Sequence, residues 1–352
     1  MRTSKYIFYL LALVALVAVM GSCKKNSTPS SYVTNKTALQ AAIDSLTTVY
    51  TNAVEGSKPG NYVVGAKEAL DSALSLAGQV AASQSFTQRQ VDNALNNLLL
   101  AGQQFQTQLL QEVSAANLVA FWKFNGNTAD SSGNGHDGTL KTGWIGNSVA
   151  TMTDGGTLPQ LTTDRFGRAN MAYDFNNGAL VQVPYSQALN PSSFTISMWV
   201  KLVANSNGGY ILSMDRWHGY KFNLNGTNVP FFTLSVSAST IYDRDAGAAN
   251  VTTAWTHLTV SFTSGTEKFY VNGSLVKTWT NVPGGAFTLA SPVDLAIGNE
   301  MPKEFYNTTD SNSPNYFYGA NYWVGSLDDI RFYNIVLTDA EVLSIYKDES
   351  TQ

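Results

Sequence analysis

The sequence predicts a mainly β fold, a two-sheet antiparallel sandwich, preceded by a small three-helix bundle. After Leu118, short runs alternate between apolar and polar residues and are separated by turn residues, as in 194–203 (FTISMWVKLV) and 254–262 (AWTHLTVSF). Asn272-Gly273 lies between two such runs, and Asn-Gly is the strongest short signal for a type I′ hairpin. Many short strands at this spacing indicate two packed antiparallel sheets.

The segment 37–114 predicts the three helices, because apolar residues recur there at intervals of three and four. The three apolar stripes are Leu39, Ile43, Leu46, Tyr50 and Val54; Ala66, Leu70, Ala73, Leu74 and Ala77; and Val91, Leu95, Leu98, Leu99, Phe105 and Leu109. Thr37 with Gln40, and Thr87 with Gln90, match capping boxes at two helix starts. Internal packing into an antiparallel bundle is a commoner explanation of such stripes than a partner-binding coiled coil. The segment has no His and few carboxylates, so we expect a spacer or platform.

The N-terminus predicts export and a lipid anchor. Residues 1–22 combine basic Arg2 and Lys5 with an uncharged apolar run that is shorter than the roughly 20 residues of a membrane-spanning helix. Met20-Gly21-Ser22-Cys23 looks like a bacterial lipobox, in which the cysteine is acylated, and Cys23 is the only cysteine in the chain. We therefore expect lipidation of Cys23, a polar linker over 23–36, and anchoring of the protein in the outer membrane, on its periplasmic or cell-surface face. The alternative is an ordinary signal peptide that contains a cysteine.

The charge balance excludes one class of partner. The signal peptide contains two of the 21 basic residues and none of the 25 acidic ones, so the mature chain has a net charge near −6. No basic stripe is visible, which argues against nucleic acid as a partner. An exported domain without disulfides must be stabilised by its own core, and the chain is long enough to build one in two domains.

Four motifs of the second half occur together in the order of a known family. They are 118–138 (LVAFWKFNGNTADSSGNGHDG), 194–200 (FTISMWV), 255–260 (WTHLTV) and 325–334 (GSLDDIRFYN), which a TDAE capping box at Thr338 follows. This pattern resembles the laminin-G-like jelly-roll of the concanavalin A-like lectin/glucanase superfamily over 118–346. The resemblance implies a jelly-roll domain over 115–348, with two curved sheets, in a family whose members bind glycans or, in some cases, proteins. The helical segment more weakly resembles modules that precede such domains in lipoproteins of glycan-foraging bacteria.

The resemblance also implies a structural Ca²⁺ near the loop 130–135 and the last strand. In a regular strand Asp328 shares a face with Ile330 and Phe332, so a core-facing Asp328 must be paired or bound to a metal. Calcium requires six to eight oxygen ligands, and Asp130, Asn134 and Asp328 with loop carbonyls could supply several. The alternative is that the loop is a plain turn and that Asp328 or Asp329 pairs with an arginine.

Sugar recognition needs flat aromatic faces and planar polar groups, and three stretches offer both. The candidate ligand-binding residues are Asp215, Arg216, Trp217, His218 and Tyr220; Tyr242, Asp243 and Arg244; and Tyr318 and Tyr322 in the long loop 301–323. Long loops without their own structure are more often functional than accidental. The alternative is that these aromatics fill the core, which we expect of Trp122, Trp199 and Trp255.

Three functions are compatible with these sequence features, and carbohydrate binding is the most favoured. A protein-binding adhesin or a subunit of a surface glycan-uptake complex is the second. A glycoside hydrolase is the least favoured, because retaining glucanases need two carboxylates roughly 5 Å apart on one strand face. The superfamily's Glu-x-Asp-x-x-Glu and Glu-x-Asp-x-Glu patterns do not occur, and only Asp243 and Asp245 could share an exposed face.

Overall fold

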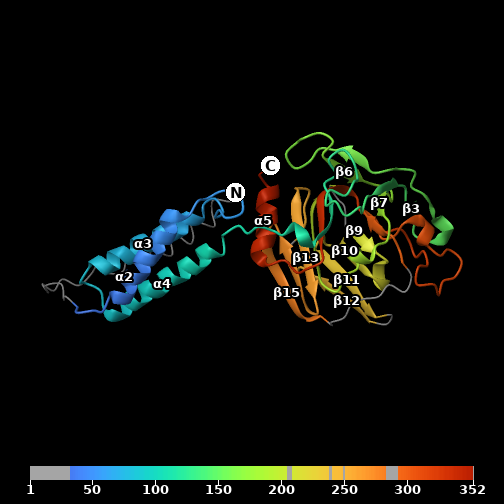
Figure 1. Cartoon of the computed structure of the whole chain (residues 1–352). Coiled ribbons are helices and arrows are strands. Elements are labelled where there is room, and N and C mark those ends of the chain that lie inside the picture. The colour runs from blue at the N-terminus through green and yellow to red at the C-terminus, as the bar shows by residue number, and fades with distance from the viewer. Residues whose placement is uncertain (1–31, 204–207, 238–239, 249, 283–291, 352) are drawn as a thin grey trace. The chain divides into compact units, whose positions relative to one another are not determined.

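The computed structural model describes residues 32–203, 208–237, 240–248, 250–282 and 292–351 (Figure 1). These residues form two compact units. The first contains the chain up to Ala53 and Lys67–Gln106, and the second contains Val54–Ala66 and the chain from Thr107 onward. The predicted fold class is confirmed, with helices in the N-terminal part and two antiparallel sheets in the rest.

The first unit consists of three helices, α2 (Thr37–Asn52), α3 (Ala66–Ala82) and α4 (Gln88–Gln106). Their buried side chains come from the predicted stripes, with Leu39, Leu70 and Leu98 almost inaccessible. Gln90 Oε1 accepts the Thr87 N–H at 2.9 Å, as a capping box requires. The predicted capping box at Thr37 is wrong: Lys36 is the N-cap and provides no side-chain cap, and the Gln40 amide donates to Asp44.

The second unit is a sandwich of two sheets with a small hairpin beside it. The eight-stranded sheet is ordered β15 (Ser274–Val282), β14 (Gly265–Val271), β13 (Thr256–Thr263), β8 (Phe194–Leu202), β17 (Gly325–Tyr333), β6 (Ala172–Phe175) and β5 (Gln160–Thr162), and β1 (Leu118–Trp122) also pairs with β17. The seven-stranded sheet is ordered β12 (Thr240–Asp245), β11 (Pro230–Ser237), β10 (Tyr220–Leu224), β9 (Gly209–Met214), β16 (Leu295–Ile297), β7 (Leu180–Val183) and β2 (Thr139–Lys141). The remaining elements are the hairpin β3 (Trp144–Ile145) and β4 (Thr153–Asp154), the 3₁₀ turns η1 (Ala115–Asn117), η2 (Val149–Thr151), η3 (Gln187–Leu189), η4 (Arg216–His218) and η5 (Lys303–Phe305), and the helix α5 (Asp339–Glu349).

An aromatic core fills the space between the two sheets. Phe194 lies within 6.0 Å, between ring centroids, of Tyr220, Phe232, Phe262 and Phe332, and all five side chains are fully buried. Burying one such side chain contributes about 1.5–3 kcal/mol. The core therefore fixes which face of every strand points inward and leaves the polar alternate positions on the outer faces.

The predicted type I′ hairpin joins β14 to β15. Asn272 and Gly273 have φ values of 51° and 73°, as both central residues of this turn require. The same hairpin contacts α5, because the ideal Cβ position of Gly273 lies 2.9 Å from Tyr346. A side chain at position 273 would therefore displace the helix as well as strain the turn.

Helix α5 packs on the outer face of the eight-stranded sheet. Thr338 caps it with Glu341 in the predicted capping box. The Tyr346 ring stacks on Trp199 at 5.7 Å, and His257 is fully buried beside both. Glu349 is completely buried at the end of the helix, where it accepts the Trp199 indole N–H at 2.8 Å. Trp199 is thus buried beneath this helix and does not fill the space between the sheets.

A buried charge cluster continues from the end of α5 to β17. Arg331 Nε donates to Glu349 at 2.6 Å, while Arg165 donates to Asp328 at 2.6 Å and to Asp329 at 2.8 Å. The regular-strand prediction for Asp328 is wrong, because β17 has a bulge between Asp328 and Arg331, with φ of 44° at Asp329. Leu327 and Ile330 therefore both point into the core, and Asp328 faces Arg165. Arginine pairing, the alternative reading of Asp328, is what the structure shows.

This cluster predicts a pH dependence of stability, because three carboxylates share two guanidinium groups. Burial and the neighbouring Asp329 raise the pKa of Asp328 to about 9, and burial raises the pKa of Glu349 to about 7. A raised carboxyl pKa means that the folded state keeps a proton that the unfolded chain releases, so stability falls as pH rises toward the folded-state value. We expect Asp328→Asn, which removes one of the competing charges, to flatten the fall in unfolding free energy between about pH 6 and about pH 9. Urea unfolding of both proteins at the two pH values measures this; parallel curves would mean that Asp328 does not titrate in this range.

Candidate functional site

The outer face of the seven-stranded sheet carries a polar surface opposite the aromatic core. In β10, Tyr220, Phe222 and Leu224 point inward, so Lys221 and Asn223 point outward. The same alternation in β11 turns Phe232 and Leu234 inward and Thr233 outward. Sheet topology thus gathers polar side chains from separate strands on one face.

Two rows of cross-strand neighbours define this face. In the first row the register joins Ser213 to Lys221, Lys221 to Thr233 and Thr233 to Asp243. In the second row Asn223 lies between Tyr210 and Phe231. We call Tyr210, Trp217, Lys221, Asn223, Thr233 and Asp243 the outer-face site. Adjacent strands lie about 4.8 Å apart, so the site spans the width of a small ligand.

Lys221 is the central charge of the outer-face site. Its ammonium lies 4.8 Å from the centroid of the Tyr210 ring and 5.1 Å from that of Trp217, and it donates to the Tyr210 hydroxyl at 2.9 Å. Only 6% of the residue is exposed, and this burial lowers the pKa of Lys221 while Asp243 and Glu300 oppose the shift. An ammonium has three N–H donors. Tyr210 takes one, and no other acceptor is found among the residues that the structure describes, so two N–H groups can serve a ligand.

The acceptors of the outer-face site lie beside this ammonium. Asp243 is exposed and accepts the Thr233 hydroxyl at 2.7 Å through one oxygen. The Asn223 side-chain oxygen is buried without a hydrogen-bond partner in the described parts of the chain. An unsatisfied buried amide oxygen costs free energy.

The sequence prediction for η4 is only partly met. Trp217 is half-buried beside Lys221, as a ligand contact requires. Arg216 is fully buried instead: it pairs with Glu300 at 3.2 Å and donates to the Tyr316 carbonyl at 2.6 Å. Since Tyr306 also donates to Glu300, at 2.8 Å, Arg216 fastens the long loop to the sheet and does not face a ligand.

Three further residues predicted near η4, Tyr220, Asp215 and His218, do not come together in one ligand-binding site. Tyr220 is sealed in the core, where its hydroxyl donates to the Leu189 carbonyl at 2.8 Å, so the prediction that it contacts a ligand is wrong. Asp215 is 3% exposed in a left-handed conformation, and burial raises its pKa to about 7. His218 is half-buried against the Pro314 carbonyl, and burial lowers its pKa.

Strand alternation places the three residues predicted in β12 on different faces of the sheet. Asp243 lies opposite Thr233 on the outer face, whereas Tyr242 lies opposite Leu234 and so faces the other sheet. Arg244 faces the same way as Tyr242, with its guanidinium 5.0 Å from the Trp279 ring of β15. Only Asp243 of the three reaches the outer-face site.

The loop tyrosines form a second exposed aromatic group. Tyr318 is 58% exposed and lies edge-on to Tyr316 at 5.0 Å between ring centroids. Tyr322 is half-buried and bridges to Asn299. No described contact joins either ring to Lys221 or Asp243, so these tyrosines stay a separate prediction.

The three predicted calcium ligands have other partners. Asp130 accepts four hydrogen bonds through its two oxygens, from Phe121 N, Ser132 N, Ser132 Oγ and His136 N. The Asn134 amide donates to the carbonyls of Leu118 and Val119, and Asp328 pairs with Arg165. Within the described ranges no group of three or more His, Cys, Asp or Glu side chains is suited to hold a metal. Because N–H and O–H donors fill the Asp130 oxygens, these residues do not fit a calcium site in this arrangement.

A thermal unfolding experiment tests calcium binding directly. A bound ion would stabilise the folded state in proportion to the logarithm of its concentration over its Kd. From the filled hydrogen bonds of Asp130 we expect midpoints in millimolar Ca²⁺ and in chelator to agree within about 1 °C. A reproducible rise of several degrees in the unfolding midpoint with calcium would contradict this expectation and support the predicted calcium site.

The segment with the predicted lipidation site, Cys23, lies outside the described residues. Within the described part of the chain, no helix has both the length and the apolar composition for a membrane span. Lipid anchoring at Cys23 and the outer-membrane location therefore stay predictions.

Sequence reasoning missed four members of the outer-face site, namely Tyr210, Lys221, Asn223 and Thr233. A signal for two of them was present, because Tyr220-Lys-Phe-Asn-Leu224 alternates as strictly as the runs that predicted strands. This alternation shows that Lys221 and Asn223 share a face of their strand, but it does not show that Tyr210 and Asp243 lie beside them. That neighbourhood depends on the strand order, which no local pattern reveals.

Comparison with known proteins finds a family model and solved structures that resemble parts of the sandwich. A structure of domain 4 of AbnA, a GH43 extracellular arabinanase from Geobacillus stearothermophilus, in complex with arabinotriose, matches with a TM-score of 0.46 and 22% identity over 65% of this chain and 98% of that domain. A binding domain of botulinum neurotoxin DC in complex with SialylT matches with a TM-score of 0.43 and 17% identity over 68% of this chain, which spans about half (52%) of that domain. No curated protein matches the chain. The family model described as "Concanavalin A-like lectin/glucanases superfamily" (Laminin_G_3) matches residues 175–343. This segment contains β9, β10, β11 and β12, the strands of the outer-face site, and over it the chain is similar to the laminin-G-like domains of the concanavalin A-like superfamily.

Proposed function

We propose that this protein is an exported, membrane-anchored lipoprotein whose sandwich binds a poly- or oligosaccharide at the outer-face site, in glycan capture. The observation that carries the proposal is the placement of the Lys221 ammonium between two aromatic rings with two N–H donors to spare. The match of residues 175–343 to the lectin/glucanase superfamily model supports the same class of ligand.

The chemistry of the outer-face site suits sugar hydroxyls. A hydroxyl both donates and accepts, so a site that recognises several of them needs donors and acceptors within a few ångströms. Lys221 supplies donors, the exposed Asp243 supplies an acceptor, and the half-buried Trp217 supplies a flat apolar surface. A few convergent polar groups beside apolar surface are typical of small-molecule sites.

The proposal is binding without catalysis. Asp243 and Asp245 are two residues apart on β12 and so share its outer face, but Asp243 accepts the Thr233 hydroxyl and Asp245 accepts the Gly247 N–H at 2.8 Å. Glu300 is held by Arg216, Tyr306 and Asn321. We expect wild-type protein to release no reducing ends from a polysaccharide that it binds.

A protein partner is the second candidate, and one observation favours it. The edge strand β15 exposes Leu275 and Val276, and an unpaired strand edge can accept a strand from another chain. Capture of one stoichiometric protein that added sugars do not displace, and that Val276→Lys abolishes, would support this function.

Affinity electrophoresis of the chain from Lys24 onward through gels containing plant, algal and host polysaccharides tests the proposal. We expect retardation by at least one polysaccharide, and loss of that retardation in Lys221→Met, which keeps the length of the side chain but removes the N–H donors. Lys141→Met, an exposed lysine of β2, is the matched control. No retardation by any polysaccharide, or equal retardation of all three proteins, would contradict the proposal.

A further inference from the structure

Two adjoining pockets open beside α5, on the outer side of the eight-stranded sheet. The first has a volume of about 240 Å³ and the second a volume of about 230 Å³. Arg331 and Asp348 line both, so the pockets meet at these two side chains. They lie on the opposite sheet from the outer-face site and share none of its residues.

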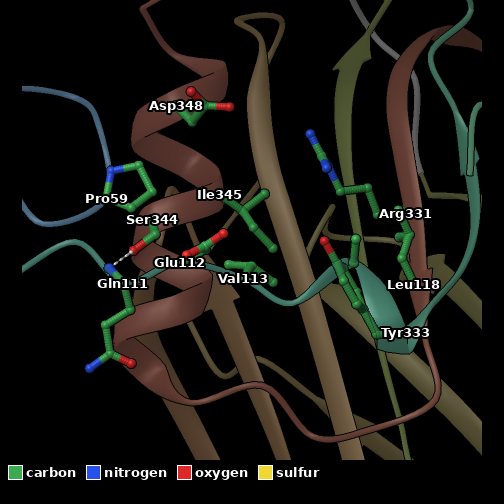
Figure 2. A pocket seen from close by; sticks show the side chains of 11 residues that line it. Pro59, Gln111, Glu112, Val113, Leu118, Arg331, Tyr333, Ser344, Ile345 and Asp348 are labelled. Carbon is green, nitrogen blue, oxygen red and sulfur yellow. Dashed lines mark hydrogen bonds between the residues drawn. The ribbon is translucent and has the colours of Figure 1, made fainter.

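The first pocket is mainly apolar. Figure 2 shows Val113 and Ile345 in its middle, between α5 and the pair Leu118 and Tyr333. The hydrogen bond from the Gln111 N–H to the Ser344 hydroxyl, at 2.7 Å, fixes the segment that carries Val113 against the helix. This compartment can cover an apolar surface of a ligand.

The second pocket is polar, and its lining contains three cationic and two anionic side chains. Its charged side chains are Lys123, Arg168 and Arg331 against Asp329 and Asp348. Asp329 is already paired with Arg165 at 2.8 Å. Arg331 uses Nε for Glu349 and also forms a hydrogen bond with the Tyr333 side chain, whereas Arg168 uses Nε for Asp164, which leaves its terminal nitrogens as donors.

Lys123, Arg168 and Asp348 are the exposed charges of this pocket. Lys123 lies over Phe121 at 5.2 Å and has no carboxylate partner among the described residues. Its ammonium and the Arg168 guanidinium can therefore meet an anion, while Asp348 can accept a hydroxyl.

We propose that these two pockets form a binding site for an acidic sugar, a uronic acid unit of a glycan. The carboxylate binds beside Lys123 and Arg168, Asp348 accepts a ring hydroxyl, and the apolar C–H face of the adjoining sugar packs against Val113 and Ile345. Each pocket is smaller than the roughly 300–1,000 Å³ of drug-sized ligand sites, and the joined pair falls within that range. A protein partner would need a contact surface of about 1,200–2,000 Å² rather than two small compartments.

Calorimetric titration of the chain from Lys24 onward with trigalacturonate and with trimannuronate, and with galactotriose as the neutral comparison, tests this site. We expect both uronates to bind more tightly than galactotriose, with an affinity that falls as salt rises. Lys123→Met should weaken uronate binding about three- to fivefold, and Asp348→Asn, which removes a like charge, should strengthen it by a similar factor. Both residues are exposed, so neither change disturbs the core.

Two controls separate this site from the outer-face site. Lys141→Met removes an exposed lysine of the other sheet and should leave uronate binding unchanged, as should Trp217→Ala. If Trp217→Ala abolished uronate binding and Lys123→Met had no effect, the acidic sugar would bind at the outer-face site. That result would overturn the inference. So would failure of both uronates to bind, or capture of a protein partner that Lys123→Met abolishes.

Discussion

Replacing Arg165 by methionine is expected to lower the free energy of unfolding by about 3–5 kcal/mol, the cost of removing one partner from a buried ion pair. The Arg165 side chain is 5% exposed and makes charge-assisted hydrogen bonds to Asp328 and Asp329. It also donates through Nε to the Glu349 carbonyl at 2.7 Å, at the end of α5. Methionine keeps the apolar stem but leaves the adjacent, largely buried carboxyl groups of Asp328 and Asp329 without the guanidinium donors. Urea unfolding near neutral pH measures the loss.

Arg168 provides the matched control for Arg165. It lies three residues further along the same loop and pairs with Asp164 at 2.6 Å, but its side chain is 44% exposed. The Asp164 carboxylate is buried, but without the Arg168 guanidinium it still accepts the backbone N–H groups of Phe166 and Arg168, so Arg168→Met should change stability less. Equal losses in the two variants would mean that the charge cluster does not hold α5 to the sheet.

Replacing Trp217 by alanine is expected to weaken binding of the captured polysaccharide about ten- to a hundredfold, the range of an aromatic hot spot. The indole supplies a flat apolar face of the outer-face site and one of the two rings beside the Lys221 ammonium. Its loss therefore removes a stacking surface and also exposes the ammonium to water. Titration of both proteins with the polysaccharide retarded in gels gives the ratio of affinities.

Tyr242→Ala is the matched aromatic control for Trp217. Tyr242 is also half-buried, but it lies opposite Leu234 and faces the other sheet. Its removal should leave glycan affinity within about twofold of wild type once the folded fraction is checked by circular dichroism. A large loss at Tyr242 with none at Trp217 would place the ligand at the edge of the sandwich instead.

Local chemistry made much of the fold predictable. Asn272-Gly273 determines its hairpin because few other residue pairs adopt two successive positive φ angles, and Leu39, Leu70 and Leu98 mark the buried helix faces by spacing alone. Asp328 was misplaced because a bulge at Asp329 changes the strand's alternation, and no sequence signal announced it. Its arginine partner, Arg165, lies 163 residues away in the sequence.

The candidate site was less predictable for a related reason. Sequence reasoning selected residues in loops and charged clusters, and so found Trp217 and Asp243 but also Arg216 and Tyr220, which are buried. Whether a polar or aromatic side chain meets solvent depends on which strand lies beside it. Lys221 became the centre of the outer-face site only once the register placed it between Ser213 and Thr233.

Hydrogen–deuterium exchange with and without the retarding polysaccharide measures where the ligand lies, and so tests the assignment of the outer-face site most directly. Bound glycan should slow exchange in 209–224 and 230–245, the strands and the η4 turn that carry Tyr210, Trp217, Lys221 and Asp243, and leave β13 and β14 unchanged. Unchanged exchange in both segments, with protection confined to the eight-stranded sheet or its edge, would contradict the assignment.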